Sequence, residues 1–329
     1  MAANLTPQYL RAERQYRQAA AAEDELYWLQ VMLRELPKHK GTDKLHAELK
    51  QKISRLKRAA ESAPVARRTS SWIMPRQGAG RVLLIGAPNA GKSRLLSWLT
   101  HAQPLVADYP FSTRAPLPGM LEWGDVSIQI VDTPPITADV FDPQFHGLIR
   151  GADLVLLVVD FSHDDGWQQA VDVIDRLRQT RTRLATTSYL DDDDLGASYT
   201  RTLLVAAKMD VPGARERYAT WSAAPDRLDW PSIAVDVDSP SDREQLSQAI
   251  FESLDVVRVY TKHPREKQPT MERPYTLPRG ATVMEVAELV HHDLARQLKH
   301  ARLWSRGSSQ PTQVRPDHIV DDGDIVELH

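Results

Sequence analysis

The feature that most constrains this 329-residue chain is a glycine-rich segment directly after a short apolar run. Arg81–Ile85 (RVLLI) has the pattern of a buried strand, residues 86–93 (GAPNAGKS) fit the spacing GxxxxGK[S/T], and residues 94–99 are typical of a helix. In this context the loop turns backbone N–H groups toward phosphate, and the N-terminus of the following helix favours the anion. The sequence therefore predicts an α/β domain of the P-loop class that binds a nucleoside triphosphate.

Two side chains of this loop carry the expected phosphate chemistry. Lys92 is placed to reach the β- and γ-phosphates, and the Ser93 hydroxyl is placed to ligate magnesium. We expect Lys92 to stabilise the charge that develops during catalysis. The loop is predicted to supply these nucleotide-binding residues: Gly86, Pro88, Asn89, Ala90, Gly91, Lys92, Ser93 and Arg94.

The identity of the base is predicted by a second segment. Residues 202–206 (TLLVA) have the pattern of a strand that ends at residues 207–210 (AKMD). The Lys208 stem can pack on a guanine plane, and the Asp210 carboxylate can accept two hydrogen bonds from guanine N1 and N2, a donor pair that adenine lacks. Ala207 stands where an amide is expected, which predicts weakened affinity for GTP. An ATP-specific protein stays open if Asp210 does not face the base.

Between these anchors lie the segments expected to sense the γ-phosphate. In residues 108–113 (DYPFST), Thr113 is the candidate that senses γ-phosphate and magnesium, and Asp132, after a predicted strand at 127–132, would hold magnesium through water. Pro135 occupies the position where a glycine would donate its N–H to the γ-phosphate, and proline has none. Losing one hydrogen bond to a charged group costs about 1.5–3 kcal/mol. Ile136 follows instead of a glutamine that could orient water, so hydrolysis would need a different group to position the attacking water or to stabilise charge.

Charge is distributed unevenly along the chain, although its total is only −3. Residues 1–75 carry fourteen Lys and Arg against eight Asp and Glu, residues 76–255 sixteen against twenty-six, and residues 256–329 eleven against ten. The near-neutral total therefore hides a basic arm joined to an acidic body. We predict domains with these bounds: a helical hairpin and linker at 1–75, the nucleotide-binding domain at 76–255 and a β-grasp domain at 256–329.

The basic arm has leucines at helical spacing on both sides of residues 37–42 (PKHKGT), which predicts two helices packed as a hairpin. Ten of its cations lie between Lys38 and Arg68. Two interpretations stay open: a solvated helix face, or a sequence-independent, salt-sensitive contact with RNA phosphates.

Composition excludes several classes of protein. The chain has no cysteine, so disulfides, thiolate metal sites and a cysteine nucleophile are absent. Its longest strongly apolar run, residues 154–159, is far shorter than the ~20 residues that cross a bilayer. We therefore expect a cytoplasmic protein with no membrane partner. Four consecutive aspartates at residues 191–194 favour a solvated loop over a cation site.

The C-terminal segment predicts strands at 256–260, near the turn at 274–280, and toward 328, with one helix at 283–298 before the last strand. This pattern is typical of a β-grasp, a small α+β fold, and the segment resembles a TGS domain. Trp304 is a candidate for base stacking, although a core or edge aromatic is the favoured interpretation.

Several segments, in this order, are similar to the Obg-related, developmentally regulated GTP-binding (DRG-like) translation-factor GTPases. They are residues 37–42, 86–93, 108–113, 132–135 and the TGS-like segment. The resemblance implies a P-loop GTPase fold, GTP/GDP and Mg²⁺ as ligands, and association with ribosomes or rRNA. TGS domains act as docking modules, so a regulatory protein partner is also expected.

The resemblance also suggests how hydrolysis could proceed without a glutamine. In relatives with a hydrophobic residue at that position, an asparagine of the phosphate loop can recruit K⁺, and Asn89 matches it. The predicted catalytic residues are thus Lys92, Thr113 and Asn89, and the predicted magnesium ligands are Ser93, Thr113 and Asp132. We expect slow GTP hydrolysis by a ribosome- or RNA-associated regulator. The alternative is a guanine-nucleotide-binding ribosome scaffold with little or no turnover, which Pro135 and Ala207 favour.

Overall fold

The structure is a computed structural model that describes most of the chain. Three predicted segments lie wholly or mostly outside its described residues: 108–113 with Thr113, the hairpin turn at 37–41 and the aspartates at 191–194. The described residues are 9, 12–13, 15–16, 22–36, 42–62, 74–100, 116–137, 145–180, 182–190, 197–225, 228–264, 270–308 and 310–329.

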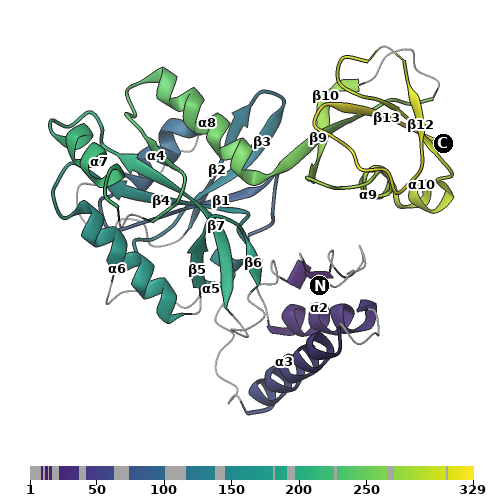
Figure 1. Cartoon of the computed structure of the whole chain (residues 1–329), viewed down its shortest axis with the longest axis horizontal. Coiled ribbons are helices and arrows are strands. Elements are labelled where there is room, and N and C mark those ends of the chain that lie inside the picture. Colours follow the sequence, from purple (N-terminus) through teal and green to yellow (C-terminus); the bar gives the residue numbers. More distant parts are fainter. Residues whose placement is uncertain are drawn as a thin grey trace.

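The centre of the molecule is a mainly parallel sheet with the strand order β2-β3-β1-β4-β7-β5 (Figure 1). Its first strand, β2, runs antiparallel to β3, and β6 and β8 both pair with β7. The strands are β1 Arg81–Ile85, β2 Leu117–Trp123, β3 Val126–Asp132, β4 Leu154–Asp160, β5 Thr182–Ala185, β6 Tyr189–Leu190, β7 Ser198–Ala207 and β8 Ser232–Ala234.

Helices cover both faces of this sheet, which explains why its central strands are apolar without alternation. In β1, Val82 and Leu84 pack on the side of α4 and α8, and Leu83 and Ile85 pack on the side of α5, α6 and α7. All four of these side chains are fully buried. The helices are α4 Lys92–Leu99, α5 Phe145–Arg150, α6 Gly166–Gln179, α7 Ala214–Ser222 and α8 Pro240–Leu254.

Two helices near the N-terminus, α2 Ala22–Glu35 and α3 Asp43–Ser62, form a hairpin below the β5 and β6 edge of the sheet (Figure 1). Leu29, Leu36 and Leu49 are buried between them. The hairpin is tied to the central domain by an ion pair between Glu25 of α2 and Arg150 of α5, with a 2.7 Å contact.

The C-terminal sheet has the strand order β10-β9-β13-β11-β12, with β9 and β13 parallel. The predicted single helix at 283–298 is wrong, because the chain is extended at His291 (φ −166°, ψ 132°). Strands β11 and β12 were not predicted. The elements are β9 Val256–Thr261, β10 Thr270–Pro278, α9 Val283–Val290, α10 His292–Gln297, β11 Ala301–Trp304, β12 Thr312–Val314 and β13 Asp324–Leu328.

A polar cluster joins the C-terminal sheet to the turn between β2 and β3. Arg258 contacts Asp125 at 3.1 Å and Asp322 at 2.7 Å, and Tyr260 also donates to Asp125. Burial and the Asp125 carboxylate raise the pKa of Tyr260 to about 12. Asp125 therefore accepts hydrogen bonds from two side chains of β9.

Within the part of the chain that the structure describes, no helix has the length and hydropathy needed to span a bilayer.

Candidate nucleotide-binding site

The phosphate loop connects the carboxyl end of β1 to the start of α4. A Cβ at Gly86 would lie 2.5 Å from the Val158 carbonyl oxygen, so the close approach of β4 requires glycine there. Gly91 has φ 101°, and the exposed Asn89 has φ 58°, a left-handed conformation that asparagine tolerates. The residue types of the loop are therefore those that its backbone needs.

Lys92 lies inside this loop and is 6% exposed. Its ammonium donates to the carbonyl oxygens of Gly86, at 2.9 Å, and Ala87, at 2.8 Å. Burial lowers the pKa of Lys92 to about 8, with Asp132 opposing the shift. The loop thus holds a desolvated cation where phosphate oxygens are expected.

A second pair of groups fits a magnesium ion. The Ser93 hydroxyl donates to Asp132 Oδ2 at 2.5 Å, and Asp132 is fully buried at the end of β3. Hydroxyl and carboxylate oxygens are hard donors of the kind that Mg²⁺ prefers. The structure brings together two of the three predicted magnesium ligands, and the third, Thr113, lies outside the described residues.

The segment after Asp132 is tied to the phosphate loop. Thr133 donates to the Leu84 carbonyl at 2.7 Å, and the Ile136 N–H donates to the Gly86 carbonyl at 3.3 Å. The Ile136 side chain is fully buried in the core beside α5 and α6. Pro135 therefore has no N–H to donate, and the side chain and N–H of Ile136 are not available to a water molecule.

The predicted base-recognition residues follow β7, the neighbour of β4 in the sheet. Ala207 faces the loop, since a Cβ at Gly91 would lie 3.9 Å from its methyl group. Lys208 is half-buried with φ 62°, and Asp210 is exposed. The Met209 N–H donates to the Val235 carbonyl, which brings residues 232–238 alongside this turn.

Sequence reasoning missed the residue that holds Lys208. Asp160, which ends β4 and is 4% exposed, accepts from the Lys208 ammonium at 2.6 Å and from the Ser162 N–H and hydroxyl. His163 contacts the same carboxylate at 2.8 Å. Burial opposes ionisation, but these hydrogen bonds hold the pKa of Asp160 below its ordinary value. Its position at the end of an apolar strand was the available signal, because parallel strand ends gather at ligand sites.

Arg94 is the last of the predicted loop residues and lies in the first turn of α4. Its guanidinium contacts Asp238, in the segment after β8, at 3.4 Å, and both side chains are more than half exposed. Arg94 therefore faces the 232–238 segment.

The comparisons with known proteins agree with this geometry. A family model described as "50S ribosome-binding GTPase" matches residues 81–188, and the TGS domain model matches residues 257–329. "Developmentally-regulated G-protein 2" of Arabidopsis thaliana is 24% identical, with 88% of this chain and 87% of that protein covered. The chain therefore carries a GTPase domain and a C-terminal TGS domain, and it is similar over most of its length to developmentally regulated GTP-binding proteins.

Other relatives of this protein are similar to it over comparable lengths. An uncharacterized GTP-binding protein of Methanocaldococcus jannaschii is 26% identical over 93% of this chain and 92% of its own. "Ribosome-interacting GTPase 1" of Saccharomyces cerevisiae is 25% identical over 94% and 97%. The YchF GTPase of Schizosaccharomyces pombe has the same fold, with a TM-score of 0.51 at 12% identity over 78% of this chain and 99% of that one. The predicted fold class is therefore confirmed.

Proposed function

We propose that this DRG-like GTPase binds GTP with Mg²⁺, hydrolyses the γ-phosphate slowly, and acts in the cytoplasm as a regulator on the ribosome or rRNA. The observation that carries the proposal is Lys92, buried inside the phosphate loop with Ser93 and Asp132 in contact beside it. We propose the domain bounds 1–75 for the hairpin and linker, 76–255 for the GTPase domain and 256–329 for the TGS domain.

The chain's own groups divide the work of binding. Phosphate oxygens replace the Gly86 and Ala87 carbonyls as partners of the Lys92 ammonium, and the backbone of residues 86–93 cradles them. Ser93 and Asp132 would hold Mg²⁺, with Thr113 as the third ligand, and the ion supplies charge neutralisation at the β- and γ-phosphates. Lys208 and Asp210 contact guanine.

Hydrolysis forms a bond between a water oxygen and the γ-phosphorus and breaks the bond from that phosphorus to the bridging oxygen, so that GDP and phosphate leave. Lys92 stabilises the charge on the transferred group. Asn89 is the candidate to hold K⁺ as a further positive charge. GTPase rates that are equal in sodium and potassium buffers would contradict a role for Asn89 in binding K⁺.

A second candidate function, a guanine-nucleotide-binding scaffold with little turnover, is favoured by one observation. Ile136 is buried in the core and its N–H is bonded to the Gly86 carbonyl, so neither its side chain nor its N–H is available to a catalytic water. The scaffold would still bind GTP through Lys92 and Ser93.

One set of measurements separates these functions. Binding and hydrolysis of GTP and ATP are measured side by side for the wild type and Lys92→Ala. Turnover of GTP that Lys92→Ala abolishes supports the hydrolase, and GTP binding without Lys92-dependent turnover supports the scaffold. Preferential binding of ATP would overturn the guanine assignment.

Ribosome association is tested through the exposed cations of α3. Lys44, Lys50 and Arg55 are exposed on the hairpin, with Lys44 79% exposed beside Glu48. Replacing all three with glutamine should weaken ribosome binding most at low salt and make the affinity less dependent on salt, because the variant makes fewer phosphate contacts for salt to weaken. Unchanged co-sedimentation at low and moderate salt would remove the hairpin from the interface.

A further inference from the structure

A cavity of about 280 Å³ lies where the central domain, the linker and the TGS domain meet. It lies near the amino end of β7 and the end of α5, whereas the phosphate loop follows the carboxyl end of β1. Its charged lining comes from five segments of the chain: Arg76 of the linker, Arg150 of α5, Asp153, Arg201 of β7, and Asp255 with Arg279 beside the TGS domain.

The four arginines outnumber the two aspartates of this lining. Asp255 is shared, since it contacts Arg279 at 3.0 Å and Arg201 at 3.5 Å. Asp153 contacts Arg76 at 2.7 Å, and burial raises the pKa of Asp153 while Arg76 opposes the shift. Arg150 also contacts Glu25 at 2.7 Å, and Arg201 also donates to the Ser253 carbonyl at 2.7 Å. Each guanidinium has five N–H donors, so these contacts still leave donors for another anion.

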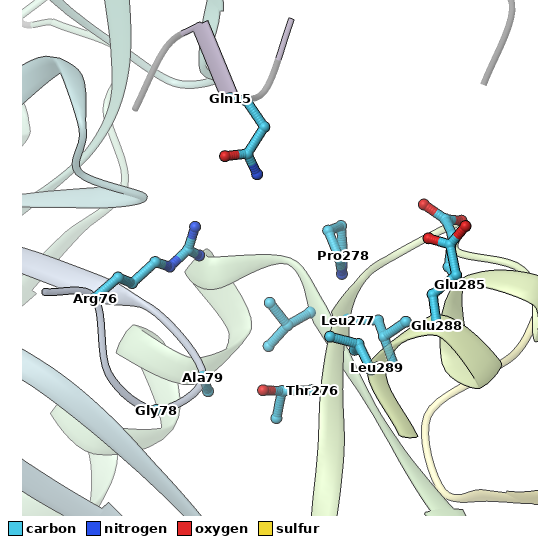
Figure 2. Close-up of a pocket in the computed structure, with 11 residues that line it drawn as sticks. Gln15, Arg76, Gly78, Ala79, Thr276, Leu277, Pro278, Glu285, Glu288 and Leu289 are labelled. Carbon is cyan, nitrogen blue, oxygen red and sulfur yellow. The ribbon is translucent and has the colours of Figure 1, made fainter. Parts of the chain in front are cut away.

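The neighbouring cavity shows that this positive excess is local. Figure 2 shows Arg76 facing across a hollow of about 300 Å³ toward Glu285 and Glu288 of α9. That hollow shares Arg76 and Pro278 with the first cavity, but its two glutamates outnumber its single arginine. The arginine-rich cavity is therefore the one suited to an anion.

Aromatic and basic groups continue from this cavity to the surface. Tyr199 lines it and stacks on Tyr189, with ring centroids 4.1 Å apart and an interplanar angle of 13°. Tyr189 is 42% exposed, so a base can approach this pair. Arg150, which also lines the cavity, contacts Glu25 of the N-terminal hairpin. Arginines beside stacked aromatic rings are the combination that binds single-stranded nucleic acid.

We infer that this arginine cavity binds a phosphate of single-stranded RNA, with an adjacent base stacked on the Tyr189 and Tyr199 pair. The inference rests on the proposed association with ribosomes or rRNA. It places an RNA contact at the junction between the GTPase and TGS domains, separate from the exposed cations of α3.

The test uses the full-length protein with saturating GDP and Mg²⁺, so that the phosphate loop is occupied. Binding of a fluorescein-labelled 12-nucleotide single-stranded RNA is measured by anisotropy at several salt concentrations. Arg279→Gln is the main variant, because this side chain is 60% exposed and its loss leaves the core intact. Arg315→Gln, also exposed and paired with an aspartate, is the matched control.

Arg279→Gln should weaken RNA binding about three- to tenfold and reduce the magnitude of the salt slope by about 0.7, the value for one phosphate contact on a single strand. Arg315→Gln should change neither, and Arg279→Lys should recover part of the affinity. Tyr189→Ala should weaken binding of RNA while leaving the salt slope unchanged.

Three results would overturn the inference. Equal RNA affinity and salt slope in the wild type and Arg279→Gln would remove the cavity from the interface, while ribosome association through the hairpin could stand. If Arg279→Gln loses binding of inorganic phosphate but binds RNA as the wild type does, the cavity is a site for small anions and not for RNA. Absence of any RNA and ribosome binding by the wild type would defeat the proposed function as well.

Discussion

The two lysines of the proposed nucleotide site, Lys92 and Lys208, are held in different ways. Lys92 donates to carbonyl oxygens of its own loop, five and six residues earlier in the chain. Lys208 donates to Asp160, a side chain 48 residues away on the neighbouring strand β4. The phosphate side is therefore organised by contiguous sequence, whereas the base side depends on the packing of two strands.

The largest expected effect tests the phosphate side. Lys92→Ala removes a buried cation that phosphate oxygens would contact, so the affinity for GTP should fall about 100-fold or more. Isothermal titration with GTP measures the loss. Lys44→Ala, at an exposed position of α3, is the control and should bind as the wild type does. A loss of less than about threefold for Lys92→Ala would show that the lysine does not contact phosphate.

The next effect tests the base side. Asp160→Asn removes the charge that holds the Lys208 ammonium, and a hydrogen bond to a charged group is worth about 1.5–3 kcal/mol. We expect GTP to bind about tenfold more weakly, with ATP binding unchanged, in competition assays against a fluorescent nucleotide. Asp164→Asn is the matched control, because that exposed carboxylate pairs with Arg217 instead. Equal losses for GTP and ATP would indicate a structural role for Asp160.

This contrast explains how much of the site could be predicted from sequence. The phosphate loop was predicted with its neighbours, because glycines, lysine and serine at fixed spacing act within one turn of chain. Asp160 was missed because its role exists only once β4 and β7 pair. The short strands β5, β6 and β8 were not predicted either, since their pairing to β7 is tertiary.

The TGS domain shows the same limit. Val283–Val290 was predicted as helical, and Thr282 and Glu285 form a capping box at its start. The break at His291 could not be read from periodicity, because apolar spacing continues through Leu294. In the structure the His291 ring accepts from the Asp293 N–H and begins α10. Local side-chain capping decided that boundary.

A pH dependence follows from the buried Lys92. Its pKa is about 8, below the ordinary 10.5, because burial disfavours the cation. Phosphate binding favours the cation, so GTP affinity should be full below pH 8 and fall by up to tenfold per unit above it. The same shift means that the nucleotide-free protein gains stability as pH rises from 8 toward 10.5. Lys92→Arg should bind GTP without this dependence, and a wild-type affinity that stays flat to pH 9.5 would contradict the assignment.

The smallest effect concerns the segment that senses the γ-phosphate. Pro135→Gly restores an N–H where the γ-phosphate is expected, so the preference for GTP over GDP should rise about three- to tenfold in paired titrations. Any proline-to-glycine change also loosens the unfolded chain and costs about 0.4–1 kcal/mol of stability.

Pro134→Gly is the matched control because it carries the same entropic cost at the adjacent position. It should leave the GTP to GDP ratio unchanged. The Ile136 N–H is already bonded to Gly86, so a new donor at position 135 would be presented by a segment that is tied to the phosphate loop. If Pro135→Gly and Pro134→Gly alter the ratio of GTP to GDP affinity equally, the absence of an N–H at position 135 does not limit the preference for GTP. If only Pro135→Gly raises the ratio, the weak response arises from one residue of this segment, and the phosphate loop itself is fully competent.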